Sequence, residues 1–153
     1  MKYVQSAVVV QSVFLAATML LATPLQSHAG QLITAEEAKL PPPKGAVATE
    51  RRGIMRGPKI LYTGPSDATK SPIRLQLKFE SYGDAKIDAN SVKMTYLRTP
   101  NVDLTSRVTK YVQPSGIDMP DAELPPGDYM LRVDLKDSDG RPASTSFTLK
   151  IAP

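Results

Sequence analysis

The stretch LPPGDYMLRVDLKDSDGRP, Leu124–Pro142, decides the fold class of this 153-residue chain. Its central apolar residues alternate with polar ones: Tyr129, Leu131, Val133 and Leu135. Because neighbouring side chains of a β-strand point to opposite faces, this period of two predicts a half-buried strand. The DSDG that follows favours a hairpin turn, since Asp and Gly tolerate the left-handed backbone that tight turns need.

The rest of the chain from residue 58 onward shows the same period. The segments with strand character are KILYTGP, PIRLQLKFE, SVKMTYLR, GIDM, AEL and STSFTLKIA. SYGDAKIDAN is interpreted as a turn region, TPNVDLTSRVTKYV as a connection with one weak strand, and the prolines are expected at strand ends. Short strands with turns every eight to twelve residues predict an all-β chain, a two-sheet β-sandwich of about seven strands over residues 58–153.

Two longer segments resemble a known family. IDANSVKMTYLRTPNVDLTSRV and LPPGDYMLRVDLKDSDGRPASTSFTLKI are similar to the bacterial immunoglobulin-like (Ig-like) domains of small exported proteobacterial proteins without assigned activity. The resemblance covers about residues 58–152 and implies a single Ig-like β-sandwich without disulfides. It also implies a tyrosine corner, in which the Tyr129 hydroxyl bonds back to the preceding loop. It implies no catalytic residues.

The first 29 residues have the composition of a secretory signal peptide. Lys2 is followed by an apolar run, and Ser27-His28-Ala29 places small residues at the two positions that a signal peptidase inspects. The clean apolar part is too short for a transmembrane helix, which needs about 20 residues. We therefore expect cleavage after Ala29, a periplasmic or secreted protein, and no transmembrane span after cleavage.

Residues 30–57 are predicted to be a flexible, basic, Pro-rich leader. QLITAEEAKL has the composition of a short helical turn, and PPPKG favours an extended chain. The basic residues that cluster in sequence are Arg51, Arg52, Arg56 and, just beyond the leader, Lys59. They are candidates for electrostatic contact with an anionic envelope polymer, and an ordinary solvated linker is the alternative. Acidic and basic residues balance from Ile60 onward, so nucleic acid is not an expected partner.

The residue types that remain after residue 29 exclude several chemistries. His28 is the only histidine and the chain has no cysteine, which removes Ser-His-Asp and Cys-His catalysis and the usual zinc and copper ligands. We expect no enzyme activity and no cofactor. A calcium loop formed by Asp134, Asp137 and Asp139 stays open as the alternative to a plain hairpin turn, although the spacing does not fit an EF-hand.

The sequence thus predicts a non-catalytic exported module that binds another envelope protein or an anionic envelope polymer. The alternative is a periplasmic carrier of a metal or small ligand, similar to the copper-carrier sandwiches. Met55, Met94, Met119 and Met130 are the soft ligands such a carrier could use, and they are scattered along the chain. Exposed strand edges and the outward-facing Leu97 and Met130 are further surfaces for a partner.

Overall fold

The computed structural model describes residues 30–45 and 56–153. The described part is all-β, with eight strands in two four-stranded antiparallel sheets and three short helices. The elements in chain order are α1 (Ala35–Ala38), β1 (Lys59–Tyr62), β2 (Ile73–Glu80), β3 (Ile87–Tyr96), β4 (Val102–Asp103), α2 (Thr105–Val108), the 3-10 helix η1 (Thr109–Tyr111), β5 (Val112–Gln113), β6 (Gly116–Ala122), β7 (Gly127–Asp137) and β8 (Pro142–Ile151).

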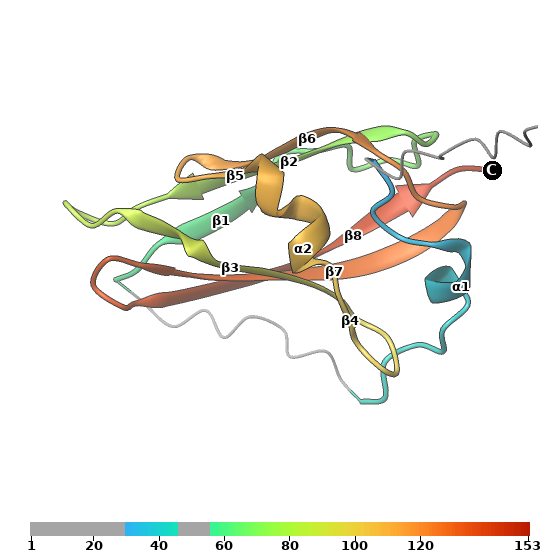
Figure 1. Cartoon of the computed structure of the whole chain (residues 1–153), viewed down its shortest axis with the longest axis horizontal. Helices are drawn as coiled ribbons and strands as arrows, with labels where there is room; N and C mark the ends of the chain where they lie inside the picture. The colour runs from blue at the N-terminus through green and yellow to red at the C-terminus, as the bar shows by residue number, and fades with distance from the viewer. Residues whose placement is uncertain (1–29, 46–55) are drawn as a thin grey trace, which may run out of the picture.

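The two sheets form two layers with the core between them (Figure 1). One sheet has the order β1-β2-β6-β5 and the other β4-β3-β7-β8. The predicted inner faces are largely confirmed. Phe147 of the last strand is only half-buried, but the other inward apolar residues of the long strands are buried: Ile73, Leu75, Leu77, Phe79, Val92, Met94, Tyr96, Tyr129, Leu131, Val133, Leu135, Leu149 and Ile151. This arrangement is of the β-sandwich type, as the alternation predicts.

Three local predictions need correction. β3 begins at Ile87, inside the segment interpreted as a turn, and its first residues pair with the far end of β7. β6 runs unbroken through Pro120, which we expected at a strand end. The pairing with β2 shifts at this point, so Pro120 lies at a β-bulge, where a missing N–H costs the ladder little. The connection after β4 forms α2 and η1.

The described part of the predicted leader, residues 30–45, is the N-terminal strap, and it is attached to the sandwich. Gln31 forms a parallel bridge with Glu123, and the Leu32 amide donates to the Glu123 carbonyl oxygen (2.9 Å). Leu32 and Ile33 are completely buried in the core. The prediction of a flexible leader is therefore wrong for these residues. Removing two adjacent large apolar side chains from water is favourable in free energy, and this favours the packed chain.

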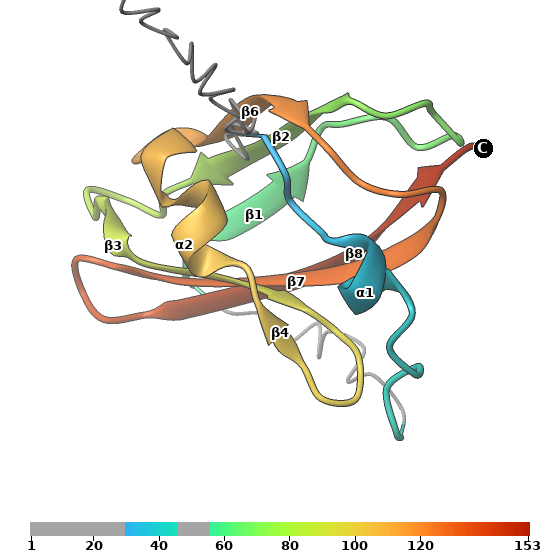
Figure 2. The same ribbon diagram turned by 45° about the vertical axis from the view of Figure 1, so that its right-hand side comes forward.

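The strap spans from one sheet to the other. Figure 2 shows it leaving the side of β6 and reaching α1 beside the second sheet. The predicted helical turn is confirmed as α1, which begins with a capping box: the Glu37 amide donates to the Thr34 hydroxyl oxygen (3.2 Å), and the Thr34 amide donates to the Glu37 carboxylate (2.9 Å). Arg107 of α2 forms a two-bond ion pair with Glu37 and also donates to the Leu32 carbonyl oxygen. These contacts hold the strap in place.

Candidate binding site

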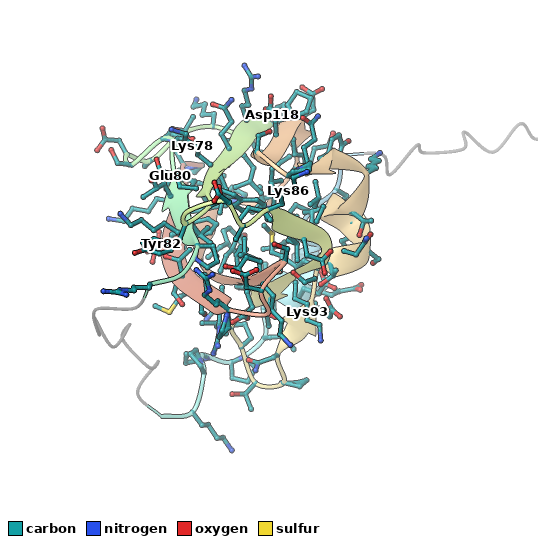
Figure 3. All side chains as sticks on the ribbon, turned by 90° about the vertical axis from the view of Figure 1, so that its left-hand side faces the viewer. Lys78, Glu80, Tyr82, Lys86, Lys93 and Asp118 are labelled. Atoms are coloured by element: carbon teal, nitrogen blue, oxygen red, sulfur yellow. The ribbon has the colours of Figure 1, made fainter. Side chains whose placement is uncertain are left out.

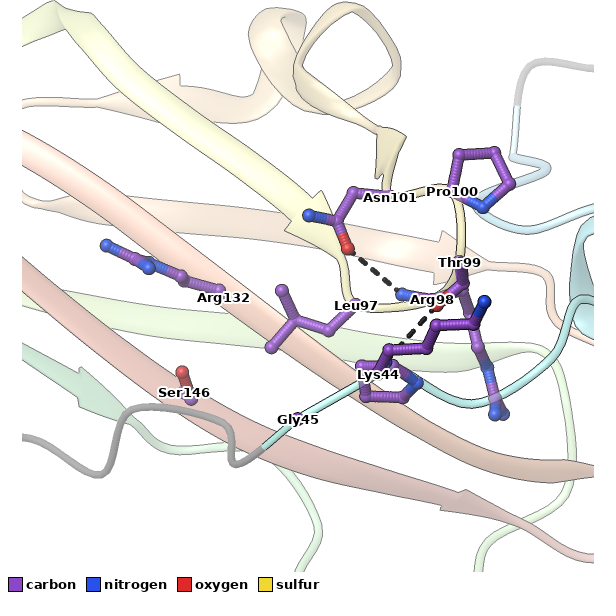
Figure 4. A pocket seen from close by; sticks show the side chains of 10 residues that line it. Lys44, Gly45, Leu97, Arg98, Thr99, Pro100, Asn101, Arg132 and Ser146 are labelled. Carbon is purple, nitrogen blue, oxygen red and sulfur yellow. Dashed lines mark hydrogen bonds between the residues drawn. The ribbon is translucent and has the colours of Figure 1, made fainter.

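A hollow of about 430 Å³ lies between the end of the strap and the loop that joins β3 to β4. It opens on the outer face of the β4-β3-β7-β8 sheet, as Figure 4 shows from close by. Its lining residues are Pro43, Lys44, Gly45, Leu97, Arg98, Thr99, Pro100, Asn101, Arg132 and Ser146. The set contains three cations and no carboxylate, so the hollow favours a negatively charged ligand.

Hydrogen bonds between the strap and the β3–β4 loop shape the hollow. The Thr99 amide donates to the Pro41 carbonyl oxygen (3.1 Å), and the Thr99 hydroxyl donates to the Pro42 carbonyl oxygen (3.1 Å). The same hydroxyl oxygen accepts from the Lys44 amide (3.3 Å). Prolines have no amide hydrogen, so this part of the strap binds the loop through the carbonyl oxygens of Pro41 and Pro42. These bonds place Lys44 beside the hollow.

The guanidinium group of Arg98 is held in place by two hydrogen bonds and a contact with an aromatic ring. Its Nε donates to the Tyr96 hydroxyl oxygen (2.6 Å), its Nη2 donates to the Asp128 carbonyl oxygen (3.1 Å), and the group lies 5.1 Å from the Tyr96 ring centre. Within the part of the chain that the structure describes, neither Arg98 nor Lys44 forms an ion pair with a carboxylate. These two positive charges are therefore available to a ligand.

The remaining polar groups are mostly hydrogen-bond donors. Asn101 uses its amide oxygen to accept from the Arg98 backbone amide (3.2 Å), which leaves its NH₂ group for a ligand. Arg132 is bound to Asp134 (2.8 Å), so its charge is largely compensated. In Figure 4 the Arg132 and Arg98 side chains point to opposite ends of the hollow, with Leu97 between them. This layout suits an extended ligand with several anionic groups better than one compact anion.

The predicted basic contact residues do not line this hollow. Arg51 and Arg52 lie outside the described residues. Arg56 and Lys59 are exposed at the start of β1, and the Arg56 carbonyl oxygen accepts from Arg141 (3.4 Å). Sequence reasoning missed the hollow because its cations come from three separate segments, and only the strap and the strand pairing bring them together. In the sequence, only the outward-facing Leu97 indicated this surface.

The acidic hairpin after β7 uses its carboxylates within the turn. Asp137 is 3% exposed, and one of its carboxylate oxygens accepts from the amides of Asp139 (3.0 Å) and Arg141 (2.8 Å). Asp139 is paired with Arg141, while Asp134 lies on the other face of β7 from Asp137 and is paired with Arg132. Gly140 has a φ of 76°, which suits glycine. This geometry favours the hairpin turn over a calcium loop.

Tyr129 occupies the position expected for a tyrosine corner. Its ring is buried, and its hydroxyl donates to the Pro125 carbonyl oxygen (2.7 Å) in the loop before β7. Burial raises the pKa of this hydroxyl above its ordinary value. This hydrogen bond holds the loop before β7 against the strand, so the role of Tyr129 is structural.

Among the described residues, the groups that a metal carrier would use do not come together. Met94 and Met119 are buried in the core and Met130 is half-buried on the outer face of β7, while Met55 lies outside the described residues. No cluster of three or more His, Cys, Asp or Glu side chains suited to a metal ion occurs in residues 30–45 and 56–153. In the same ranges, the helices are too short and polar to cross a membrane. None of these observations favours the carrier alternative.

Comparison of the sequence with protein-family models and with curated proteins finds no match in either case. The Ig-like resemblance therefore depends on the residues and the strand order alone.

Proposed function

We propose that this chain is a non-catalytic binding module of the cell envelope, and that the hollow binds an extended anionic envelope polymer. The observation that carries the proposal is the pair of cations at the hollow, Lys44 and Arg98, which have no carboxylate partner among the described residues. Arg98 is positioned by Tyr96 and Asp128 before any ligand arrives. Such preorganisation lowers the entropic cost of binding.

The strand order supports the finer proposal of an Ig-like domain. In Ig domains one sheet has the order A-B-E-D and the other contains C-F-G, with an extra strand C′ beside C in some members. The observed orders β1-β2-β6-β5 and β4-β3-β7-β8 correspond to A-B-E-D and C′-C-F-G. Tyr129 lies near the start of β7, the strand that corresponds to F.

The envelope location is part of the same proposal and depends on the signal-like segment of residues 1–29, which lies outside the described residues. An exported protein meets phosphorylated and carboxylated polymers that a neutral domain with a cationic hollow can recognise. The predicted basic residues Arg51 and Arg52 follow the strap in sequence, so they would add to the attraction for the same polymer.

The test is binding of the chain from Gly30 onward to dextran sulfate. Neutral dextran of the same length is the control that should not bind. Replacing Lys44 and Arg98 together by Gln removes these two cations from the hollow. At about 1 kcal/mol per charged contact, we expect the dissociation constant for dextran sulfate to rise roughly 30-fold. Thermal unfolding of the variant shows whether the domain remains folded.

The matched control removes two positive charges from the opposite sheet. Lys78→Gln with Arg74→Gln gives the same change in net charge, and both residues are exposed on the outer face of β2. Figure 3 shows Lys78 on that sheet and Lys93 on the other. We expect less than a threefold effect in the control. An equal loss in both variants would show that only net charge matters, and absence of binding by the unchanged chain would overturn the proposal.

A further inference from the structure

The outer edge of β8 has backbone groups that no described residue uses. The Thr69 amide donates to the Lys150 carbonyl oxygen, and the Ala152 amide donates to the Thr69 carbonyl oxygen, both at 3.0 Å. The backbone groups of residues 150 and 152 therefore point away from β7. Because this direction alternates along a strand, the amides and carbonyls of Ser144, Ser146 and Thr148 also point away from β7. Within the described residues these groups have no hydrogen-bond partner.

Among the described residues, only two features protect this edge: Pro142 at its first outward position, and β1, whose Tyr62 ring stacks on the Phe147 ring of β8 with centroids 4.5 Å apart. Proteins shield such edges with charged residues, prolines, bulges or very short strands. β8 has ten residues, pairs with β7 without a register shift, and carries no charged side chain from Pro142 to Leu149. The other edge strands of the described sheets are short: β1 has four residues, and β4 and β5 have two each.

The sequence of β8 is complementary to itself in one antiparallel register. If two copies of β8 pair around Thr145, Ser144 lies opposite Ser146 of the other copy and Pro142 lies opposite Thr148. All four positions direct their backbone groups outward, and Pro142 can still accept through its carbonyl oxygen. No charged residues oppose each other in this register, so pairing meets no like-charge repulsion.

We propose that two copies of this chain associate through β8 and join their β4-β3-β7-β8 sheets into one continuous sheet. The partner is a second copy because β8 can pair with itself in an uncharged register. No side chain of a different protein is needed to complete this pairing. Coverage of Lys150 and Ala152 by Thr69 limits the contact to residues 142–148. The association is a symmetric dimer in which both copies use the same surface.

This dimer has a consequence for binding. Two antiparallel strands of one sheet are related by a two-fold axis perpendicular to the sheet, so both outer faces lie on the same side. Ser146 lines the hollow, so the two hollows lie near each other and can bind one polymer chain at two points. Two linked contacts raise the apparent affinity well above that of one. This consequence rests on the proposed function, whereas the pairing of β8 does not.

Sedimentation velocity of the chain from Gly30 onward, without any polymer, tests the pairing separately from the proposed function. We expect a monomer–dimer equilibrium that shifts with protein concentration. Ser146→Pro removes an outward-pointing amide hydrogen without removing a β7–β8 hydrogen bond, and it should weaken association at least about tenfold. A chain that remains monomeric at all accessible concentrations overturns the proposal.

Two charge variants test the register itself. Ser144→Lys with Ser146→Lys places like charges opposite each other twice, and association should fall about tenfold or more. Ser144→Glu with Ser146→Lys places opposite charges at the same two pairs and should retain or strengthen the dimer. Thermal unfolding of each variant reports on the monomer fold. Equal behaviour of the two variants would overturn the proposed register, and a dimer unaffected by all three changes would place the interface elsewhere.

Discussion

Replacing Glu37 by Gln should make the stability of this protein less dependent on pH. Glu37 accepts two hydrogen bonds from Arg107, both at 2.7 Å, and one from the Thr34 amide. The hydrogen bonds from Arg107 lower the pKa of the Glu37 carboxyl group from 4.5 to about 2. The folded state therefore favours the ionised carboxylate more strongly than the unfolded state does.

The sign and size of the effect follow from this difference. A carboxyl pKa lowered by folding stabilises the folded state above the unfolded pKa, and that contribution is lost as the pH falls from about 5 to about 2. Since a tenfold change in proton affinity equals about 1.4 kcal/mol, the upper limit is about 3 kcal/mol. The Glu37 side chain is 19% exposed and that of Arg107 is 30% exposed, so solvent screening reduces the expected contribution to about 1–2 kcal/mol.

Urea unfolding of the chain and its Glu37→Gln variant at several pH values measures this contribution. We expect the variant to be less stable by about 1–2 kcal/mol at pH 7 and the two proteins to converge near pH 2, because Gln keeps the size of the side chain but not its charge. Glu36→Gln is the matched control, since Glu36 is the exposed neighbour in the same helix. A difference that stays constant across pH, or an equal effect in the Glu36 variant, would refute this reasoning.

Three further substitutions, the first with a control at an exposed position, test the structure by urea unfolding. Leu32→Ala should cost about 2–4 kcal/mol because Leu32 is completely buried, whereas Leu61→Ala, at a position 41% exposed, should cost less than about 1 kcal/mol. Tyr129→Phe should lower the free energy of unfolding by about 1 kcal/mol, since the Pro125 carbonyl oxygen loses its donor. An unchanged free energy of unfolding would contradict a structural role for the tyrosine corner. Asp137→Ala should cost about 1–3 kcal/mol by freeing two turn amides, and stabilisation of the unchanged chain by added calcium would contradict the turn interpretation.

The sequence was sufficient for the fold class because the strands carry a local signal. Each long strand alternates apolar and polar residues, and this period alone identifies which side chains are buried. The failures lie where a distant partner determines local structure. Residues 87–90 read as a turn because Asp88 and Asn90 are poor strand formers, yet pairing with β7 extends β3 through them.

The N-terminal strap is a second case in which distant residues determine local structure. QLITAEEAKL has too few apolar residues to predict a packed element, and nothing local indicates that Leu32 and Ile33 enter the core. Their burial depends on Glu123 and Arg107, which lie far along the chain and supply the hydrogen bonds that hold the strap. The hollow depends on the strap in turn, so the sequence could predict neither the site nor its cations.

This dependence determines how binding should be tested. A chain that begins at residue 58 lacks the basic leader, but it also lacks Leu32, Ile33 and the partner of Arg107. Loss of polymer binding by that chain would follow equally from a damaged core, so truncation cannot separate electrostatics from folding. Neutral substitutions at Lys44 and Arg98 leave the buried part of the strap unchanged, so a binding loss without a stability loss assigns the role to the hollow. If those variants bind normally while the chain from Gly30 onward still binds dextran sulfate, the contact must lie on other basic residues, and Arg51, Arg52, Arg56 and Lys59 become the next candidates.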